Sequence, residues 1–406
     1  MKKIVVLLLC LCQVFLADAQ LFSWFSKDND GKKTEMLLGN RTIQIEAGNA
    51  VNAMYNFDFE KADLEYRWFQ SKYPDHPIGP FLIGLNAWWK IVPNTKMTKY
   101  DQDMETNMDR AIDLAENLLD VDENNKEAAF FASAAYAFKG RLYAEREKWT
   151  KATWAGKNAL KYLDKTRGNE DLSPEMAIGD GLYNYYSKWI PENYPSLKGI
   201  LLFFRKGNKE KGMKQLELVA NNAFYTRVEA RYFLVQVYAS EGEHLKAYTM
   251  SKYMHQTYPN NPFFHRFLAR EAFVLGRLVE AEKVAGELLK NIENKKFGYE
   301  TTEGRYASYI IAYANQNGSG DIQKAKVFYQ KVIDYSIEGD AKDSGYFHAA
   351  NLALGKYADD EKDFAKAREY YKIVIDNAEK KSDQYKQAKV ALENNKKLQR
   401  TERKKK

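Results

Sequence analysis

The sequence predicts an all-α protein, a right-handed α-solenoid of about eight helix-turn-helix pairs with insertions and a C-terminal capping helix. Two consecutive blocks of 34 residues, 228–261 and 262–295, each contain an apolar-periodic helix, a glycine break and a second helix. The matching positions of the two blocks are Gly242 with Gly276 and Ala247 with Ala281. With nine prolines, 23 glycines and 45% hydrophobic residues in a chain of 406, the composition favours helices with an extended core.

The first 19 residues are interpreted as a secretory signal peptide. Two lysines follow the initial methionine, residues 4–16 are mostly apolar, and Ala17 and Ala19 suit a cleavage site. This pattern predicts export to the periplasm or the outer envelope. No later segment approaches the roughly 20 uncharged residues that a membrane-spanning helix needs, so no transmembrane segment is expected. Peripheral association with a membrane stays open.

Residues 20–41 are expected to form a mobile leader, because they are mostly polar and contain glycine. The paired helices are expected over residues 42–378, where a small residue recurs in the second helix of each pair. These small residues are Ala62, Ala111, Ala152, Gly212, Ala247, Ala281, Ala325 and Ala367. Their spacing varies from 34 to 60 residues, which predicts insertions between several pairs.

The order of glycine, alanine and a late proline, Pro259, resembles the tetratricopeptide repeat of exported bacterial proteins. In that family the glycine ends the first helix, the alanine allows the second helix to pack closely against it, and the proline stops the second helix. The resemblance implies an adaptor or scaffold that binds a protein or peptide in the concave groove of the solenoid. A subunit of an envelope transport or assembly system fits the same expectation.

Residues 173–212 depart from a plain repeat. They contain Gly179, Gly181, Pro191 and Pro195, and an apolar run over 199–204. This order of motifs resembles a stretch of the tetratricopeptide-repeat 39 and inclusion-body-clearance family, and of exported repeat proteins associated with tripartite transport. The resemblance implies an interaction protein and supplies no catalytic residue. Packing is the expected role of the glycines, which let one helix approach another closely.

Residues 379–406 are expected to form a capping helix followed by a basic disordered tail. Tyr385, Ala388 and Leu392 continue a helical stripe. Residues 386–406 hold nine Lys or Arg and two Glu, whereas the whole chain has a formal net charge of +7. The basic character therefore belongs to the tail, and no nucleic-acid partner is expected.

The sequence predicts no catalytic residue, no metal site and no cofactor, and therefore no enzyme. Both cysteines, Cys10 and Cys12, lie in the expected signal peptide. None of the five histidines stands four residues from another, which is the spacing of a helical metal pair. His244, His255 and His265 could converge only across adjacent helices. Nucleophile-elbow and phosphate-loop motifs are absent from the sequence.

Partner-binding residues are expected on the first helix of each pair, which lines the groove in the tetratricopeptide family. The positions carried over from the family are Glu229, Tyr232, Gln236 and Ala239, then Phe263, Arg266, Arg270 and Phe273. Arg266 and Arg270 are four residues apart, so they share a helical face on which two guanidinium groups could bind a carboxylate. The alternative is a salt bridge from either arginine to Glu271 or to a neighbouring repeat.

Two other functions stay open. A solute-binding accessory protein of a transporter would hold an apolar or sugar ligand against groove aromatics such as Tyr232 and Phe263, and it would need an enclosed pocket. An unrecognised hydrolase would need a clustered acid and base with shifted pKa values.

Overall fold

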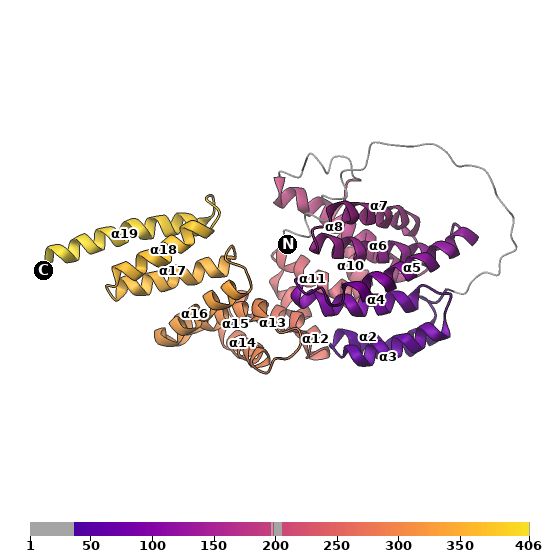
Figure 1. Ribbon diagram of the computed structural model, residues 1–406, viewed down its shortest axis with the longest axis horizontal. Coiled ribbons are helices and arrows are strands. Elements are labelled where there is room, and N and C mark those ends of the chain that lie inside the picture. Colours follow the sequence, from indigo (N-terminus) through magenta and orange to yellow (C-terminus); the bar gives the residue numbers. More distant parts are fainter. Residues whose placement is uncertain (1–35, 196–197, 199–204, 406) are drawn as a thin grey trace. The chain divides into compact units, whose positions relative to one another are not determined.

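The computed structural model describes residues 36–195, 198 and 205–405. The expected signal peptide, most of the expected leader and the apolar run over 199–204 lie outside these residues. All regular secondary structure in the described part is helical, and the helices pack in sequence order (Figure 1). The chain divides into two compact units, Met1–Glu241 and Gly242–Lys406. The expected all-α solenoid is confirmed.

The first unit consists of helices, most of which pack against the next one along the chain. These are α2 (Arg41–Tyr55), α3 (Phe59–Lys72), α4 (Ile78–Ile91), α5 (Asp101–Val121), α6 (Lys126–Glu145), α7 (Trp149–Thr166), α8 (Ala177–Asn193), α10 (Lys209–Asn222) and α11 (Arg227–Ser240). Short 3₁₀ turns at Val92–Asn94 and Pro174–Met176 follow α4 and precede α8. Asparagines cap several of the helices, for example Asn40 at α2 and Asn125 at α6.

Of the expected leader over residues 20–41, the structure describes only residues 36–41, and two of these are held in place. Leu37 and Leu38 are buried, and their backbone N–H groups donate to the carboxylate of Glu127 at 3.0 and 2.6 Å. This attachment joins residues about 90 positions apart in the chain. The polar composition of the leader did not predict this attachment, because the carboxylate that accepts the two hydrogen bonds belongs to α6.

The expected irregular segment, 173–212, contains α8 and the start of α10. These helices cross at two glycines, Gly181 and Gly212. A Cβ atom on Gly212 would lie 2.6 Å from the backbone nitrogen of Tyr185 and 2.7 Å from the carbonyl oxygen of Gly181. Only glycine allows the two backbones to approach this closely, as the sequence predicted for the glycines of this segment.

The second unit consists of α12 (His244–Thr257), α13 (Pro262–Val274), α14 (Leu278–Glu293), α15 (Thr301–Ala314), α16 (Ile322–Glu338), α17 (Gly345–Asp360), α18 (Phe364–Asn377) and α19 (Asp383–Lys405). Besides the contacts between neighbours in sequence, α13 lies against α15, α15 against α17, and α17 against α19. In the described part of this unit, no contact as large as these joins α14 to α16 or α16 to α18. The first helices of the pairs therefore form the inner layer.

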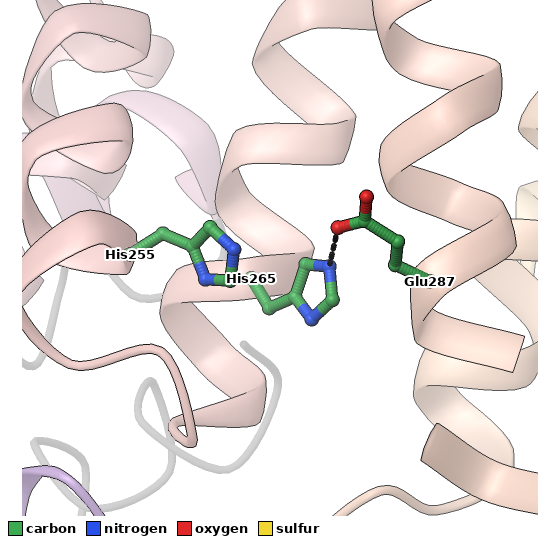
Figure 2. Close-up of side chains that lie close together, drawn as sticks. All are labelled: His255, His265 and Glu287. Carbon is green, nitrogen blue, oxygen red and sulfur yellow. Dashed lines mark ion pairs between the residues drawn. The ribbon is translucent and has the colours of Figure 1, made fainter. Parts of the chain in front are cut away.

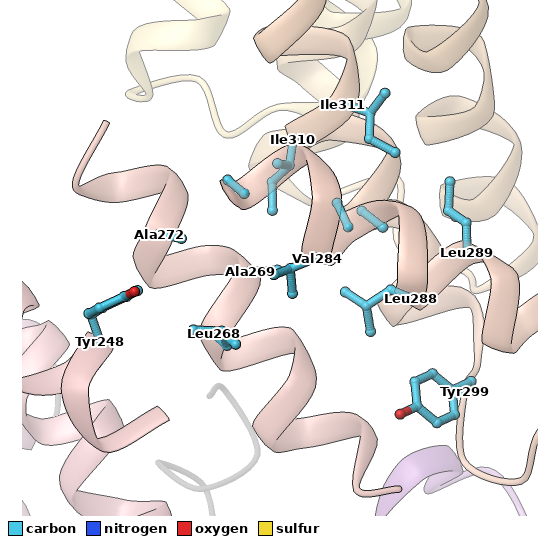
Figure 3. Packing of buried hydrophobic residues seen from close by; sticks show 13 residues of the cluster. Tyr248, Leu268, Ala269, Ala272, Val284, Leu288, Leu289, Tyr299, Ile310 and Ile311 are labelled. Carbon is cyan, nitrogen blue, oxygen red and sulfur yellow. The ribbon is translucent and has the colours of Figure 1, made fainter. Parts of the chain in front are cut away.

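Small residues sit where the helices of a pair meet. Ala281 is fully buried in a cluster that also contains Ala269, Ala272 and Ala285. Figure 3 shows other members of this cluster, among them Leu268 and Leu288. The seven alanines picked out by the sequence pattern are all at most 1% exposed: Ala62, Ala111, Ala152, Ala247, Ala281, Ala325 and Ala367. Gly242 and Gly276 follow α11 and α13 with φ angles of 79° and 72°, the left-handed conformation that ends a helix.

The expected disordered tail is helical instead, because α19 continues to Lys405. Strong helix formers fill its last turns, and no glycine or proline interrupts them. Asn395 is fully buried and donates to the Phe364 carbonyl at 3.1 Å, which fixes α19 against α18. None of the helices in the described residues is both long enough and apolar enough to cross a membrane.

Candidate functional site

The first unit contains a pocket of about 300 Å³ between α4, α6, α7, α8 and α11. Its lining is mostly aliphatic and aromatic, and includes Phe81, Leu85, Phe130, Phe138, Leu163, Leu182, Tyr186 and Phe233. Two of the described lining residues are charged, Arg141 and Glu229. A pocket with apolar walls and few polar groups suits a small apolar ligand that carries one polar group.

Glu229 is a buried acid that forms no ion pair with any of the described residues. Its side chain accepts a hydrogen bond from Trp89 Nε1 at 2.8 Å. Burial raises the pKa of Glu229 to about 7, against the opposing effects of Trp89, Arg141 and Tyr55. The carboxyl group is therefore partly protonated near neutral pH.

Arg141 supplies the positive charge of the pocket. Its guanidinium lies over the Trp88 ring, 4.8 Å from the centroid, and its Nε is buried without a hydrogen-bond partner among the described residues. Leaving such a group unbonded is costly, so the pocket contains a donor suited to an acceptor on a ligand.

The groove residues expected on α11 belong to the packed interior of the first unit. Glu229 and Tyr232 are 7% and 8% exposed. The Tyr232 ring meets Trp89 edge-on with centroids 5.7 Å apart, and Gln236 donates to the Tyr232 carbonyl at 3.2 Å. The structure thus places Glu229 in the pocket wall and gives Tyr232 a packing contact.

The groove residues expected on α13 lie in the inner layer of the second unit, where both arginines have internal partners. Arg266 forms an ion pair with the buried Glu303 and lies 5.1 Å from the centroid of Phe263. Arg270 lies 2.6 Å from a carboxylate oxygen of the fully buried Glu271. The salt-bridge alternative considered for these arginines is the arrangement that the structure contains.

Aromatic rings continue this inner face across three helices. We call Phe273, Tyr306, Tyr309, Tyr313 and Tyr346 the inner aromatic row. Phe273 meets Tyr313 edge-on at 5.0 Å, and Tyr346 lies 4.6 Å from Tyr309 and 4.8 Å from Tyr306. All five side chains are partly exposed. Their spacing on α15, at positions i, i+3 and i+7, is the sequence signal that could have identified them.

Arg305 stands beside the inner aromatic row. Its Nε is buried without a hydrogen-bond partner among the described residues. Burial lowers the pKa of Arg305 from its ordinary value, and the charge of Arg266 adds to this effect. Arg266 and Arg270 are paired with Glu303 and Glu271, while the charges of Glu303 and Asp343 act on Arg305.

The three histidines that could converge across adjacent helices divide into two groups. His244 Nδ1 lies 2.9 Å from Glu271, away from the others. His255 and His265 stack on each other with centroids 4.3 Å apart, and Glu287 lies beside them. The structure therefore brings together two of the three histidines that could converge, with a carboxylate that sequence spacing did not indicate.

The sequence matches no protein-family profile and no curated protein. Among solved structures, the chain is similar to the tetratricopeptide-repeat domain of P58(IPK), with 13% identity and a TM-score of 0.26. The similarity covers 88% of this chain and 98% of that domain. The paired helices and the small residues between them establish the fold of this chain independently.

Proposed function

We propose that the chain is a scaffold of the tetratricopeptide type that binds a polypeptide partner along the inner face of its second unit. The observation that carries the proposal is the inner aromatic row, which spans α13, α15 and α17 with its rings partly exposed. Partly exposed tyrosines offer large contact areas together with a hydroxyl group, and such residues dominate protein interfaces.

The charge of the same face indicates the chemistry of the partner. Because Arg266 and Arg270 are paired with Glu303 and Glu271, Arg305 is the arginine best placed to receive an added anion. A peptide with an acidic side chain beside aromatic or apolar ones would complement both features. The proposal assigns no catalytic residue and no cofactor.

A site-specific crosslinking experiment tests the polypeptide-binding function. A photoreactive phenylalanine analogue replaces Tyr313 on the inner face, and in a control it replaces Val279, which is 87% exposed on α14. The expected result is a discrete crosslinked partner from position 313 and none from position 279, with the yield reduced by Arg305→Gln. Equal crosslinking from both positions would contradict the proposed face.

The pocket of the first unit supports a second candidate function, binding of a small apolar solute. Its apolar walls, the buried acid Glu229 and the unbonded Nε of Arg141 are the specific observations in favour. Binding of a fluorescent fatty-acid analogue measures this function directly. Ala134→Phe fills the pocket and should abolish binding, whereas Ala365→Phe, on the exposed face of α18, should leave it unchanged.

We also propose that the chain is exported. The support is the pattern of residues 1–19, with basic residues, an apolar stretch and small residues at the cleavage position. Mass spectrometry of the protein from fractionated cells tests it. A mature N-terminus at Gln20 in the periplasmic or outer-envelope fraction is expected, and an intact N-terminus in the cytoplasmic fraction would contradict export.

A further inference from the structure

Three side chains with metal-binding atoms meet in the second unit, on three consecutive helices. His255 belongs to α12, His265 to α13 and Glu287 to α14 (Figure 2). One ligand atom from each lies within 4.8 Å of the other two. His265 Nε2 is 3.9 Å from a carboxylate oxygen of Glu287.

The two imidazoles have buried nitrogen atoms that the described residues leave unbonded. Neither His255 Nδ1 nor His265 Nε2 has a hydrogen-bond partner there. His265 is 1% exposed, so water cannot readily take the place of a partner. Leaving a buried polar group without a hydrogen bond is unfavourable, and the packing of the two rings does not offset this cost.

Lys296 is the cation whose charge acts on both imidazoles, and its ammonium group donates to the side-chain oxygen of Asn260 at 2.7 Å.

The other ring nitrogen of His265, Nδ1, is also held in the way that is usual for metal-binding histidines. Its Nδ1 lies 3.2 Å from the hydroxyl of Tyr299, a buried residue. A hydrogen bond at one ring nitrogen fixes the orientation of the ring and leaves the other nitrogen for the metal. Tyr299 thus positions the ring without touching the site.

We propose that His255, His265 and Glu287 bind a zinc-class transition-metal ion, with a water molecule at the remaining position. Two imidazole nitrogens and one carboxylate suit Zn²⁺, whereas Mg²⁺ and Ca²⁺ prefer oxygen ligands alone. Ligand atoms about 2.0–2.2 Å from a tetrahedral ion lie roughly 3.3–3.6 Å apart, so the cluster contracts on binding. Glu287 is half-exposed and can rotate to close the site. The ion would tie three consecutive helices of the solenoid together.

Calorimetric titration of the metal-free full-length chain with Zn²⁺ tests the proposal. The variants are Glu287→Gln and His255→Gln, and the matched control is Glu293→Gln, an exposed carboxylate on the same helix α14. The wild-type chain and the control should bind one ion per chain and gain thermal stability. Each cluster variant should bind at least about tenfold more weakly, since even indirect partners of a metal ligand contribute that much.

Equal zinc affinity in the wild-type chain, the control and both cluster variants would overturn the proposal, as would the absence of binding in the wild-type chain. Co²⁺ in place of Zn²⁺ separates the cluster from Cys10 and Cys12. Histidine and carboxylate ligands give visible d–d bands without a thiolate charge-transfer band. A thiolate band that disappears in a Cys10→Ser/Cys12→Ser variant would assign the metal to the cysteines instead.

Discussion

Buried carboxylates in the first unit differ in pKa according to the donors around them. Asp180 is buried, but hydrogen bonds from Gln215 and Arg167 and the charge of Arg205 outweigh the effect of burial and lower its pKa. At Glu229 burial outweighs the hydrogen bond from Trp89 and the opposing effects of Arg141 and Tyr55, and raises the pKa to about 7. The first carboxylate therefore stabilises the fold as an anion, and the second does so mainly in its protonated form.

The shifted pKa of Glu229 gives a pH-dependent stability. Between pH 4.5 and 7 the folded chain binds more protons at this carboxyl than the unfolded chain, so the free energy of unfolding falls as pH rises through that window. Glu229→Gln keeps an acceptor for Trp89 and removes the ionisation. We expect the variant to be more stable than wild type at pH 8, by at most about 3 kcal/mol, and similar at pH 4.

Urea denaturation at the two pH values measures this difference. The matched control is Glu60→Gln, an exposed carboxyl in the first turn of α3. A stability difference between the Glu229 variant and wild type that is independent of pH would show that Glu229 titrates normally.

Arg266 and Arg270 are expected to stabilise the second unit. Glu303 and Glu271 are 1% and 0% exposed, so the substitutions remove an arginine partner from each buried carboxylate and place an added carboxylate beside it, while Glu271 keeps only its contact with His244. The double substitution Arg266→Glu/Arg270→Glu should lower the free energy of unfolding by about 3 kcal/mol or more. Thermal and chemical unfolding measure it. Wild-type stability together with lost partner capture would instead assign the two arginines to partner binding.

At the scale of the helices, the sequence predicted the contacts that depend on local spacing. The alanine and glycine positions were found because a helix pair admits only small residues where its axes approach most closely. Of the inner aromatic row, only Phe273 was among the predicted groove residues. His255 and His265 were named as able to converge, but Glu287 was not placed with them, because each group combines side chains from three helices. Their proximity depends on how successive pairs are stacked, which no local pattern records.

The helical end of the chain was missed for a related reason. The charge of residues 386–406 suggested disorder. This helix is held by tertiary contacts that the sequence pattern does not predict. They include the hydrogen bond from Asn395 to the Phe364 carbonyl and an ion pair between Lys362 and Glu402.

Two substitutions on α14 test the helix packing in opposite directions. Ala281→Leu adds volume at a fully buried position of a packed cluster, and it should destabilise the chain by about 1–3 kcal/mol. Gly286→Ala adds a Cβ atom that meets nothing within 4 Å, and it should stabilise the chain by about 0.5–1 kcal/mol. Thermal unfolding compares the two. Equal melting temperatures would mean that the register assigned to α14 is wrong.

At the scale of the whole molecule, each unit is an array in which stability comes from neighbouring helices. In the second unit α15 has helices on both sides along the array, whereas α19 contacts α17 and α18 alone. Backbone amides in α15 and α16 should therefore exchange with solvent more slowly than those in α19, most clearly after Leu392. Hydrogen exchange followed by mass spectrometry measures this. Equal protection of α19 would indicate a partner that covers it.

The attachment of Leu37 and Leu38 to Glu127 has a consequence for the way the chain folds as it is made. The ribosome completes about 90 further residues between Leu37 and its acceptor. At the usual speed of translation this takes on the order of ten seconds. During that interval the first described residues have no carboxylate to bind, so α2 and α3 can form on the nascent chain before their N-terminal end is fastened. The N-terminal attachment of the first unit can therefore form only after Glu127 of α6 has been made.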